Sequence, residues 1–360
     1  MKVLCVIDFL SSGGAQRQLV NMAVAFKEKG YDVDFLVYYN HDFYSSLLQQ
    51  HDIEVHLIRS TNHFDRILKI RRFIRNGNFN VVLSFLQTVN FICELSGFPY
   101  RKWRLIVGER SANPNILKST KLKFYRFFHL FADHIVANSY QNISLVRQIN
   151  PFLAAKKCHV VYNMIDHSIW CPSTSYVPLK NGFFNLVVLA RYNLLKNPIG
   201  LIEAVNVLPD IYKRRLKVRW YGEVKKDEAF EQAILLTEEY GLQNCICLNT
   251  ECKDVLPLIQ EADCIGLFSF HEGMPNVVCE GMAVGKPIMC SNVSDIPRLL
   301  KNPKYYFNPH NIQEIKETIM YFMDLSDEEL IEVGNENRRM SKVYFDHETV
   351  IDKYIQFMTK

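Results

Sequence analysis

The sequence predicts an α/β protein built from two doubly wound, Rossmann-like domains. Three observations lead to this prediction: a length of 360 residues, short apolar runs that alternate with helical periodicity, and a polar, proline-bounded break at residues 172–178. Single hydrophobic cores rarely exceed ~250–300 residues, so this length favours two domains. Strands that alternate with helices favour a parallel sheet covered on both faces. We place the domains at residues 1–168 and 169–345 and expect a C-terminal helix at about 346–360, free to pack back on the first domain.

The first half contains a series of expected strands separated by helical stretches. An apolar run at residues 3–7 begins it, and a helix follows over residues 15–29, where apolar residues recur at three- and four-residue steps. Gly30 ends this helix in the manner of a helix C-terminus. The further strands of this half are expected at residues 33–37, 81–85, 104–107, 134–139 and 158–163.

The second half restarts the same alternation after the break. The interruption is short and polar, which is typical of a linker or a domain edge. The strands of this half are expected at residues 185–190, 217–221, 245–248, 264–268 and 287–290.

Composition and charge exclude several classes of protein. Hydrophobic residues make up 48% and charged residues 22%, which excludes a disordered chain, and no apolar run approaches the ~20 residues that cross a bilayer. The ten cysteines form no C-x-x-C pair, so we expect reduced packing thiols in an intracellular protein. The net charge of +4 hides an uneven division, because residues 1–165 carry +10 and the remainder −6. One domain is therefore expected to face an anionic surface.

The most informative segment runs from residue 268 to residue 287. An apolar strand at its start is followed by a loop rich in Gly and Pro, and a helix begins near Pro275 or Asn276. The unsatisfied amides of a helix start and the positive end of its dipole form an anion site. Glu272 lies in the loop and Glu280 one turn into the helix, which suits a ligand with a diphosphate and hydroxyls. From spacing alone, an ordinary strand–loop–helix connection with two structural acids is an equal alternative.

Two cations follow the first strand of the second half. Arg191 is a forked donor and Lys196 a compact cation, a pair suited to a diphosphate leaving group. Open α/β sheets bind ligands beyond the carboxyl ends of their strands, which is where these cations and the two glutamates are expected. For either cation taken alone, an ordinary surface charge is the alternative.

Together these residues resemble the GT-B glycosyltransferases of family four. Glu272-x₇-Glu280, with Gly273 after the first acid, is similar to the E-x₇-E signature of that family, and Arg191 and Lys196 fall on its Arg-x₄-Lys pattern. The family's Gly-Gly-Ala-Glu turn and Asn-Gly-Val-Asp crossover are resembled by Gly13-Gly14-Ala15-Gln16 and by Asn163-Met164-Ile165-Asp166. The resemblance covers nearly the whole chain in the expected order.

The resemblance implies a GT-B fold, in which two Rossmann-like domains face each other across a cleft. It assigns the first domain to the acceptor and the second to the nucleotide-sugar donor. Glu272 matches the acid near the donor sugar, and Glu280 matches the acid that binds the ribose hydroxyls. We expect Glu272, Arg191 and Lys196 to be catalytic, the two cations by neutralising the phosphates. The other donor-binding residues implied are Gly273, Met274, Pro275, Asn276, Val277, Val278, Gly13 and Gly14.

Three residues of the first half are candidates for the acceptor side. Glu109 and Arg110 resemble a Glu-Arg strand end that recurs in one bacterial subgroup of the family. Asn90 ends a Ser-Phe-Leu…Asn segment that resembles the same subgroup. Many relatives carry a histidine in this segment and this chain does not, which leaves the histidine's role unassigned.

The resemblance implies a hexosyltransferase-type reaction from a UDP- or GDP-sugar to an acceptor hydroxyl, with retention at the anomeric carbon. The expected acceptor is a lipid-linked or growing glycan in bacterial polysaccharide or lipopolysaccharide assembly. Because cations can replace a metal at the diphosphate, we expect no metal and no other cofactor. Alternatives are a nucleotide-sugar epimerase of the same fold and a non-catalytic nucleotide-sugar-binding protein. A Rossmann oxidoreductase is disfavoured because G-x-G-x-x-G is absent after the first strand.

Two basic stretches, residues 66–75 and 117–128, mix cations with large apolar residues at helical steps. One interpretation is that each is a helix with a solvated basic face and a core face. The other is docking on anionic lipid, where each basic side chain contributes about 1 kcal/mol. The second interpretation agrees with the basic first half and predicts a cytoplasmic protein peripheral to the inner face of the cell membrane. Nucleic acid is not an expected partner, since no recognised binding motif accompanies the charge.

Overall fold

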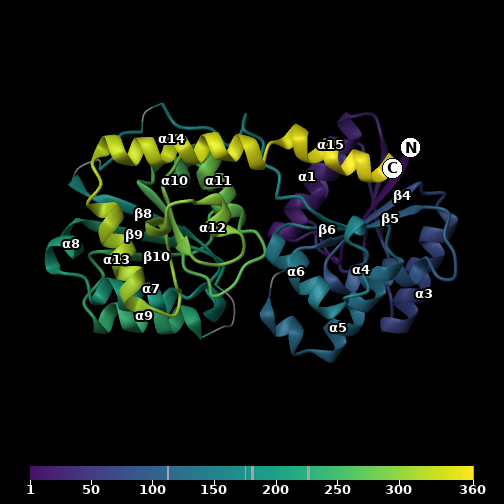
Figure 1. The fold of residues 1–360 in the computed structure, drawn as a ribbon, viewed down its shortest axis with the longest axis horizontal. Coiled ribbons are helices and arrows are strands. Elements are labelled where there is room, and N and C mark those ends of the chain that lie inside the picture. Colours follow the sequence, from purple (N-terminus) through teal and green to yellow (C-terminus); the bar gives the residue numbers. More distant parts are fainter. Residues whose placement is uncertain (112, 175, 180–181, 225–227, 360) are drawn as a thin grey trace. The chain divides into compact units, whose positions relative to one another are not determined.

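The computed structural model describes residues 1–111, 113–174, 176–179, 182–224 and 228–359. The chain divides into two units (Figure 1). Unit 1 contains Met1–Met164 and Glu348–Lys360, and unit 2 contains Ile165–His347. The sequence places these boundaries at 168/169 and 345/346, a few residues away from the divisions in the structure. The predicted fold class is confirmed, because each unit is a parallel sheet packed against helices.

The described residues of unit 1 form a seven-stranded sheet in the order β3-β2-β1-β4-β5-β6-β7, with parallel pairing throughout. The strands are β1 (Lys2–Val6), β2 (Asp32–Val37), β3 (Glu54–Leu57), β4 (Val81–Phe85), β5 (Arg104–Glu109), β6 (His134–Ala137) and β7 (Cys158–Val160). The helices are α1 (Gly14–Glu28), α2 (Ser45–Gln50), α3 (His63–Asn76), α4 (Gln87–Ser96), α5 (Thr120–Phe127), α6 (Tyr140–Ile149) and α15 (His347–Thr359), with 3₁₀ turns η1 (Pro114–Leu117), η2 (Phe128–Phe131) and η3 (Ala155–Lys157).

Helices cover both faces of this sheet, and alternate residues of β1 show why. Val3 and Cys5 belong to a core shared with α1 and α15, whereas Leu4 and Val6 belong to a second core shared with α3 and α4. Successive side chains of a strand point to opposite faces, so a strand covered on both sides has no polar positions. This explains the continuous apolar run in the sequence.

The C-terminal helix α15 lies on unit 1, far in sequence from the strands it covers (Figure 1). Val350, Ile351, Tyr354 and Met358 are buried in the same core as β1 and α1. Their spacing of one, three and four residues places them on one face of a helix. The apolar face of α15 thus completes the core on one side of the unit 1 sheet.

The described residues of unit 2 form a six-stranded sheet in the order β10-β9-β8-β11-β12-β13, also with parallel pairing. The strands are β8 (Phe184–Leu189), β9 (Leu216–Tyr221), β10 (Ile246–Asn249), β11 (Cys264–Leu267), β12 (Ile288–Ser291) and β13 (Tyr306–Phe307). The helices are α7 (Pro198–Asn206), α8 (Asp210–Arg215), α9 (Ala229–Glu239), α10 (Leu256–Glu261), α11 (Asn276–Val284), α12 (Ile296–Leu299), α13 (Ile312–Met323) and α14 (Asp327–Tyr344), with 3₁₀ turns η5 (Leu194–Lys196) and η6 (Pro303–Tyr305).

Two glycines allow α14 to pack closely against the end of α11 (Figure 1). Gly285 ends α11 with a φ of 79°, a conformation that glycine adopts without strain. A Cβ atom on Gly334 of α14 would lie 2.1 Å from the Gly285 carbonyl oxygen. Close packing at this point holds the C-terminal end of the helix whose N-terminus lies in the candidate site.

Two further observations bear on the sequence analysis. Among the described residues, no helix combines the length and apolar character that crossing a membrane requires. The ten cysteines, all of which lie within the described ranges, are free thiols, and six of them are buried.

Candidate active site

Each sheet has one position where the strand order reverses, and the predicted site residues follow the strands on either side of it. In unit 2 the first strand, β8, lies between β9 and β11, and in unit 1 the first strand, β1, lies between β2 and β4. Open α/β sheets bind ligands at such positions, beyond the carboxyl ends of the strands. Arg191 and Lys196 follow β8, and Glu272 and Glu280 follow β11. The topology therefore brings all four to the same edge of the unit 2 sheet.

Lys196 and Glu272 are in direct contact, although 76 residues separate them. The Lys196 ammonium donates a hydrogen bond to Oε1 of Glu272. Lys196 ends the short turn η5, whose N-terminus is capped by the Asn193 side chain at 3.0 Å from the Lys196 amide. The next residue, Asn197, has a φ of 58° and caps α7 through the Gly200 amide at 3.0 Å. Two capped turns in succession thus fix the backbone on both sides of Lys196.

The loop that carries Glu272 is held by contacts on each side of it. Ser269 Oγ donates to Glu272 Oε1 at 2.7 Å, and the Phe270 amide donates to the Leu195 carbonyl at 2.9 Å. The second bond joins this loop directly to the turn that carries Lys196. Further along, Ser294 Oγ donates to the Gly273 carbonyl. These contacts position the Glu272 carboxylate, which is 16% exposed, beside the Lys196 ammonium.

Helix α11 begins directly after this loop, so its N-terminus lies at the same edge of the sheet. Pro275 is the N-cap residue and makes no side-chain capping bond, and no acidic residue lies in the first turn. The positive end of a helix dipole favours a negative group at such a position. Gly273, Met274 and Pro275 lead into the helix, whereas Asn276, Val277 and Val278 form its first turn. Their contact with a donor stays a prediction.

Glu280 lies inside α11 and is only 3% exposed. The sequence analysis expects it one turn into the helix, and it occurs at the fifth helical residue. Its assignment to ribose hydroxyls stays a prediction.

Arg191 lies at the same edge but is more exposed than the other three residues. Its side chain is 49% exposed and its Nε lies 3.9 Å from Oε2 of Glu223. The preceding Ala190 carbonyl accepts a hydrogen bond from Trp220 Nε1 at 2.7 Å, which anchors the chain at this point. Gly222 packs against the same carbonyl. Arg191 thus has an anchored backbone and a half-exposed side chain, and its phosphate role stays a prediction.

In unit 1, Gly13 and Gly14 lie at the start of α1, just after β1. Gly13 is the N-cap residue, and Gly14 is the first residue of the helix. The Gln16 side chain folds back over Gly13, because a Cβ atom there would lie 2.3 Å from its Oε1. Gln16 also donates to the Asp8 carboxylate at 3.4 Å. A side chain at position 13 would displace the flexible end of Gln16, and the approach of Gly13 to a diphosphate stays a prediction.

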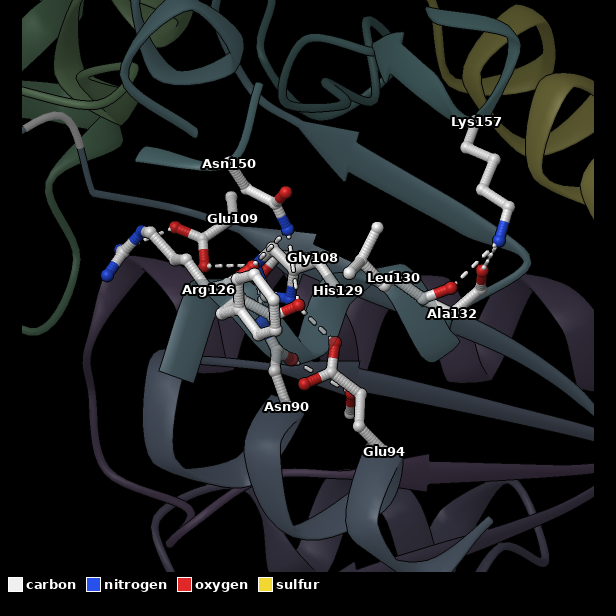
Figure 2. A network of polar contacts seen from close by, with 12 residues as sticks. Asn90, Glu94, Gly108, Glu109, Arg126, His129, Leu130, Ala132, Asn150 and Lys157 are labelled. Atoms are coloured by element: carbon white, nitrogen blue, oxygen red, sulfur yellow. Dashed lines mark hydrogen bonds and ion pairs between the residues drawn. The ribbon is translucent and has the colours of Figure 1, made fainter. Parts of the chain in front are cut away.

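Asn90 lies within a buried polar network of unit 1 (Figure 2). It accepts a hydrogen bond from Ser84 Oγ at 2.8 Å and donates one to the Gly108 carbonyl at 3.0 Å. These bonds tie α4 to β4 and β5. The side chain therefore acts inside unit 1, and contact with an acceptor stays a prediction.

Glu109 bridges two buried cations in the same network (Figure 2). One oxygen accepts from Arg126 at 2.7 Å and the other from His129 Nε2 at 3.1 Å, while His129 Nδ1 donates to Glu94 at 2.6 Å. Burial raises the pKa of Glu109, but Arg126 and His129 outweigh burial and hold that pKa below its ordinary value. The carboxylate is 1% exposed, so its contact with an acceptor stays a prediction.

Arg126 corrects one expectation. The stretch 117–128 is predicted to have a solvated basic face, yet Arg126 is 1% exposed. Helical periodicity indicates the face on which a residue lies but not whether a distant acid pairs with it. Glu109, from a strand, supplies that acid.

Arg110 follows Glu109 and points into a different environment. Its guanidinium lies 3.8 Å from the centre of the Phe85 ring and donates to Asn163 Oδ1 at 3.3 Å and to the Tyr354 hydroxyl at 2.6 Å. Burial lowers the pKa of Arg110, while the Tyr354 hydroxyl partly opposes that effect. Its Nε is buried without a hydrogen-bond partner.

Sequence reasoning missed the residues that position the predicted ones. Ser269 precedes Glu272 by three residues, and Asn193 precedes Lys196 by three, a spacing that is typical of local side-chain bonds and could have identified both. His271 was also missed. Its pKa is lowered by burial and by Lys196, while Glu272 opposes them. Ser294, 21 residues from Gly273, has no comparable local signal.

Sequence models of two glycosyltransferase families match the chain. The model described as Glycosyltransferase Family 4 matches residues 12–169, and the model described as Glycosyl transferases group 1 matches residues 177–341. The two matches fall on the predicted first and second domains in the order that the motifs indicate.

Curated relatives and solved structures agree with these matches. The chain is 24% identical over 295 residues to the alpha-1,4-N-acetyl-D-galactosaminyltransferase of Campylobacter jejuni that acts on GalNAc-alpha-(1->4)-GalNAc-alpha-(1->3)-diNAcBac-PP-undecaprenol, covering 78% of this chain and 77% of the relative. It is also 24% identical over 314 residues to the lipopolysaccharide core biosynthesis glycosyltransferase LpsD of Rhizobium meliloti, covering 81% and 78%.

Among solved structures, Anabaena Alr3699/HepE superimposes with a TM-score of 0.86 at 17% identity, over 100% of this chain and 99% of that chain. At this identity the likeness concerns the fold, whose GT-B class agrees with the two parallel sheets described above. The fold, the ordered motifs and the two family matches together place the chain among the family 4 glycosyltransferases of the GT-B fold.

Proposed function

We propose that this glycosyltransferase moves a sugar from a UDP- or GDP-sugar to a hydroxyl of a glycan acceptor, with retention at the anomeric carbon. Unit 2 holds the donor and unit 1 receives the acceptor. The acceptor is a lipid-linked or growing glycan of bacterial polysaccharide assembly. The observation that carries this proposal is the contact between Lys196 and Glu272 at the start of α11.

The chemistry follows from what surrounds that contact. A diphosphate seated at the first amides of α11 meets the helix dipole and lies at the sheet edge that carries Lys196. The bond between the anomeric carbon and the diphosphate oxygen breaks, and its electron pair leaves with the diphosphate. The acceptor oxygen forms the new bond on the same face, and its proton passes to the departing phosphate oxygen. Lys196 and Arg191 stabilise the charge that develops on the leaving group.

In this proposal Glu272 has two roles. It receives hydrogen bonds from the Lys196 ammonium and from Ser269, so it fixes the cation in place. Its other oxygen, Oε2, remains for the hydroxyls of the donor sugar. We propose that no metal is required, because Lys196, Arg191 and the positive end of α11 oppose the negative charge of the diphosphate. Within the described ranges, no group of three or more His, Cys, Asp or Glu side chains is arranged to hold a metal ion.

The names of related proteins support the proposed substrates. Anabaena HepE has been crystallised with UDP and with UDP-glucose. The Campylobacter jejuni relative acts on a glycan carried by a PP-undecaprenol lipid. These names favour a UDP-sugar donor and an acceptor joined to lipid through a diphosphate.

The test is an assay of transfer with purified protein. Candidate UDP- and GDP-sugars are incubated with glycan acceptors, and the product is identified by mass spectrometry and its anomeric configuration by NMR. We expect transfer with retention in the wild type and none with Glu272→Ala. Glu203→Ala on α7 is the matched control and should leave the rate unchanged. Conversion of the donor into its epimer without acceptor would instead identify the chain as an epimerase.

We further propose that unit 1 lies against anionic lipid on the cytoplasmic face of the membrane. Aromatic rings on α4, α5 and η2 form a continuous chain of contacts, and several of them are exposed. The rings of this aromatic cluster are Phe91, Phe98, Phe124, Tyr125, Phe128 and Phe131. The exposed lysines of the same segment are Lys118, Lys121 and Lys123. Aromatic rings beside lysines suit the headgroup region of an anionic bilayer.

Vesicle sedimentation tests the lipid proposal. Replacing Lys118 and Lys123 by Gln should weaken binding to phosphatidylglycerol vesicles about 30-fold, at about 1 kcal/mol for each lysine. Replacing Lys69 and Arg72 on α3 by Gln removes the same charge elsewhere in unit 1 and should have little effect. Equal binding by both double variants would contradict the assignment to α5.

A further inference from the structure

A cavity of about 460 Å³ lies at the carboxyl end of the unit 1 sheet. It is lined by residues that follow β1, β2 and β5 and by the starts of α3, α4 and α5, and therefore occupies the position where the strand order reverses. Such positions bind ligands in open α/β sheets, and this volume lies within the range of small-molecule sites. The lining residues that matter here are Asp8, Tyr39, Arg66, Thr88, Arg110 and Lys121.

Three of these residues are cations without an acidic partner. Within the part of the chain that the structure describes, no carboxylate lies at ion-pair distance from Arg66, Arg110 or Lys121. Arg66 is only 8% exposed, and its guanidinium lies over the rings of Tyr38 at 4.5 Å and Tyr39 at 4.7 Å. Its hydrogen-bond partners are not carboxylates: they are Ser60 Oγ at 3.2 Å and His63 Nδ1 at 3.4 Å.

The same unit shows how a buried arginine is otherwise stabilised. Arg126 is 1% exposed and is paired with Glu109 at 2.7 Å. A buried charge without a counter-ion is unfavourable, so folded proteins normally supply one. Among the described residues, Arg66 is buried almost as deeply and receives no carboxylate, whereas the Nε atoms of Arg110 and Arg126 are both buried without a partner. The one carboxylate of the cavity wall, Asp8, is engaged by the Phe9 amide and by Gln16.

The N-terminus of α4 adds a second positive feature to the cavity. Its N-cap residue, Leu86, makes no side-chain cap and has a φ of 78°, a left-handed conformation that is strained for leucine. Gln87, Thr88 and Val89 form the first turn and line the cavity. The turn contains no acidic residue, so the positive end of the helix dipole lies at the same cavity as the cations.

We propose that this unit 1 cavity binds a phosphate or diphosphate group of the acceptor. The inference rests on the proposed function, because it assumes that unit 1 receives the acceptor. The anion lies between the start of α4 and the guanidinium groups of Arg66 and Arg110, with Lys121 at the mouth. Tyr39, which is 44% exposed, offers a ring face to the adjoining sugar. The acceptor is thus selected by its charged linkage as well as by its terminal sugar.

Calorimetry with inorganic pyrophosphate tests this site in the presence of saturating UDP, so that the donor side is already occupied. We expect the wild type to bind pyrophosphate, and Arg66→Met and Lys121→Met each to weaken that binding at least tenfold. Lys121 is exposed, so Lys121→Met is expected to fold even where Arg66→Met does not. Arg72→Met, an exposed residue of α3, is the matched control and should not change the affinity.

Two results would overturn the proposal: no pyrophosphate binding to the UDP-saturated wild type, or unchanged binding in Lys121→Met. If a glucuronic acid glycoside competed with pyrophosphate equally well, the cavity would bind anions in general, and its assignment to a phosphate group would be overturned. Transfer assays separate this inference from the proposed function. If a diphosphate-linked acceptor and its uncharged glycoside have the same KM, and Lys121→Met raises neither, the function stands and this site fails. If pyrophosphate binds as expected but no sugar is transferred to any acceptor, the site stands and the function fails.

Discussion

The buried network around His129 predicts that the stability of unit 1 depends on pH in the neutral to alkaline range. Burial disfavours the charged imidazole, but Glu94 and Glu109 outweigh burial and raise the pKa of His129 from 6.5 to about 9. The imidazolium is therefore the stable form at neutral pH, held between two carboxylates (Figure 2). In the unfolded chain the same residue loses its proton near its ordinary pKa.

The sign and the size of the effect follow from this difference. A pKa that is raised on folding contributes stability below the unfolded value, and that contribution is lost as the pH rises through the folded value. At 1.36 kcal/mol for each pH unit, a change from 6.5 to about 9 corresponds to about 3 kcal/mol. We therefore expect the contribution of His129 to the stability of unit 1 to be complete below pH 6.5 and to fall by about 3 kcal/mol between pH 6.5 and 9.

Two measurements check this expectation. The imidazole titration of His129 by NMR should give a pKa well above 6.5. Hydrogen exchange of the β4 and β5 amides, corrected for the intrinsic effect of pH, reports the free energy of opening of unit 1. His129→Gln keeps a hydrogen-bonding side chain but cannot become charged, so its opening free energy should vary far less over this range. His134→Gln is the control in the same unit, since the pKa of His134 is lowered and it titrates below pH 6.5.

Either of two results would refute the reasoning. One is a His129 imidazole that titrates at or below pH 6.5. The other is the same pH dependence of opening in the wild type and in His129→Gln, which would mean that the two carboxylates do not hold the proton.

Three further predictions concern other parts of the molecule. Gly222→Ala would place a Cβ atom 1.9 Å from the Ala190 carbonyl oxygen, so we expect a loss of about 1–3 kcal/mol in the free energy of unfolding and weaker UDP binding. Chemical denaturation and calorimetry measure the two effects. Unchanged values would show that the backbone at the end of β8 can move to accept the extra atom. Removal of metal ions with EDTA should leave transfer within about twofold, because Lys196 and the start of α11 supply the positive charge; restoration of a lost activity by Mn²⁺ or Mg²⁺ would contradict this. Burial and the His159 ring at 3.0 Å lower the pKa of His134 to about 4. The stability that the neutral His134 contributes is therefore present above pH 6.5 and is lost as the pH falls toward 4. Hydrogen exchange of the β6 amides should show this loss in the wild type and not in His134→Gln.

The sequence predicted most strands because central strands are buried on both faces and appear as continuous apolar runs. It missed β3 and β13. The residues of β3, Glu54–Leu57, are half-buried or exposed at the edge of the sheet, and β13 contains only Tyr306 and Phe307. An exposed or very short edge strand lacks a continuous apolar run, so the apolar pattern alone does not identify it.

The candidate site, like the fold, could be predicted from the sequence only in part. The positions of Lys196 and Glu272 relative to their strands could be predicted, because the carboxyl ends of neighbouring parallel strands meet at one edge. Their direct contact could not, because it depends on the Phe270–Leu195 bond between two loops. Arg66 could not be distinguished from Arg72 either. Both lie on α3 in the same basic stretch, yet one is buried and the other exposed.

Burial distinguishes two kinds of basic residue in the positively charged first half of the sequence. A net charge of +10 over residues 1–165 is compatible with a solvated basic surface, and the exposed lysines of α5 fit that interpretation. Arg66 does not, because a helix could place it in water at no cost and the fold instead buries it over two tyrosine rings without an acid. In unit 2 the lysine of the candidate site, Lys196, is paired with Glu272. If the unit 1 cavity binds an anion as proposed, that ligand supplies the negative charge that Glu272 supplies to Lys196 in unit 2.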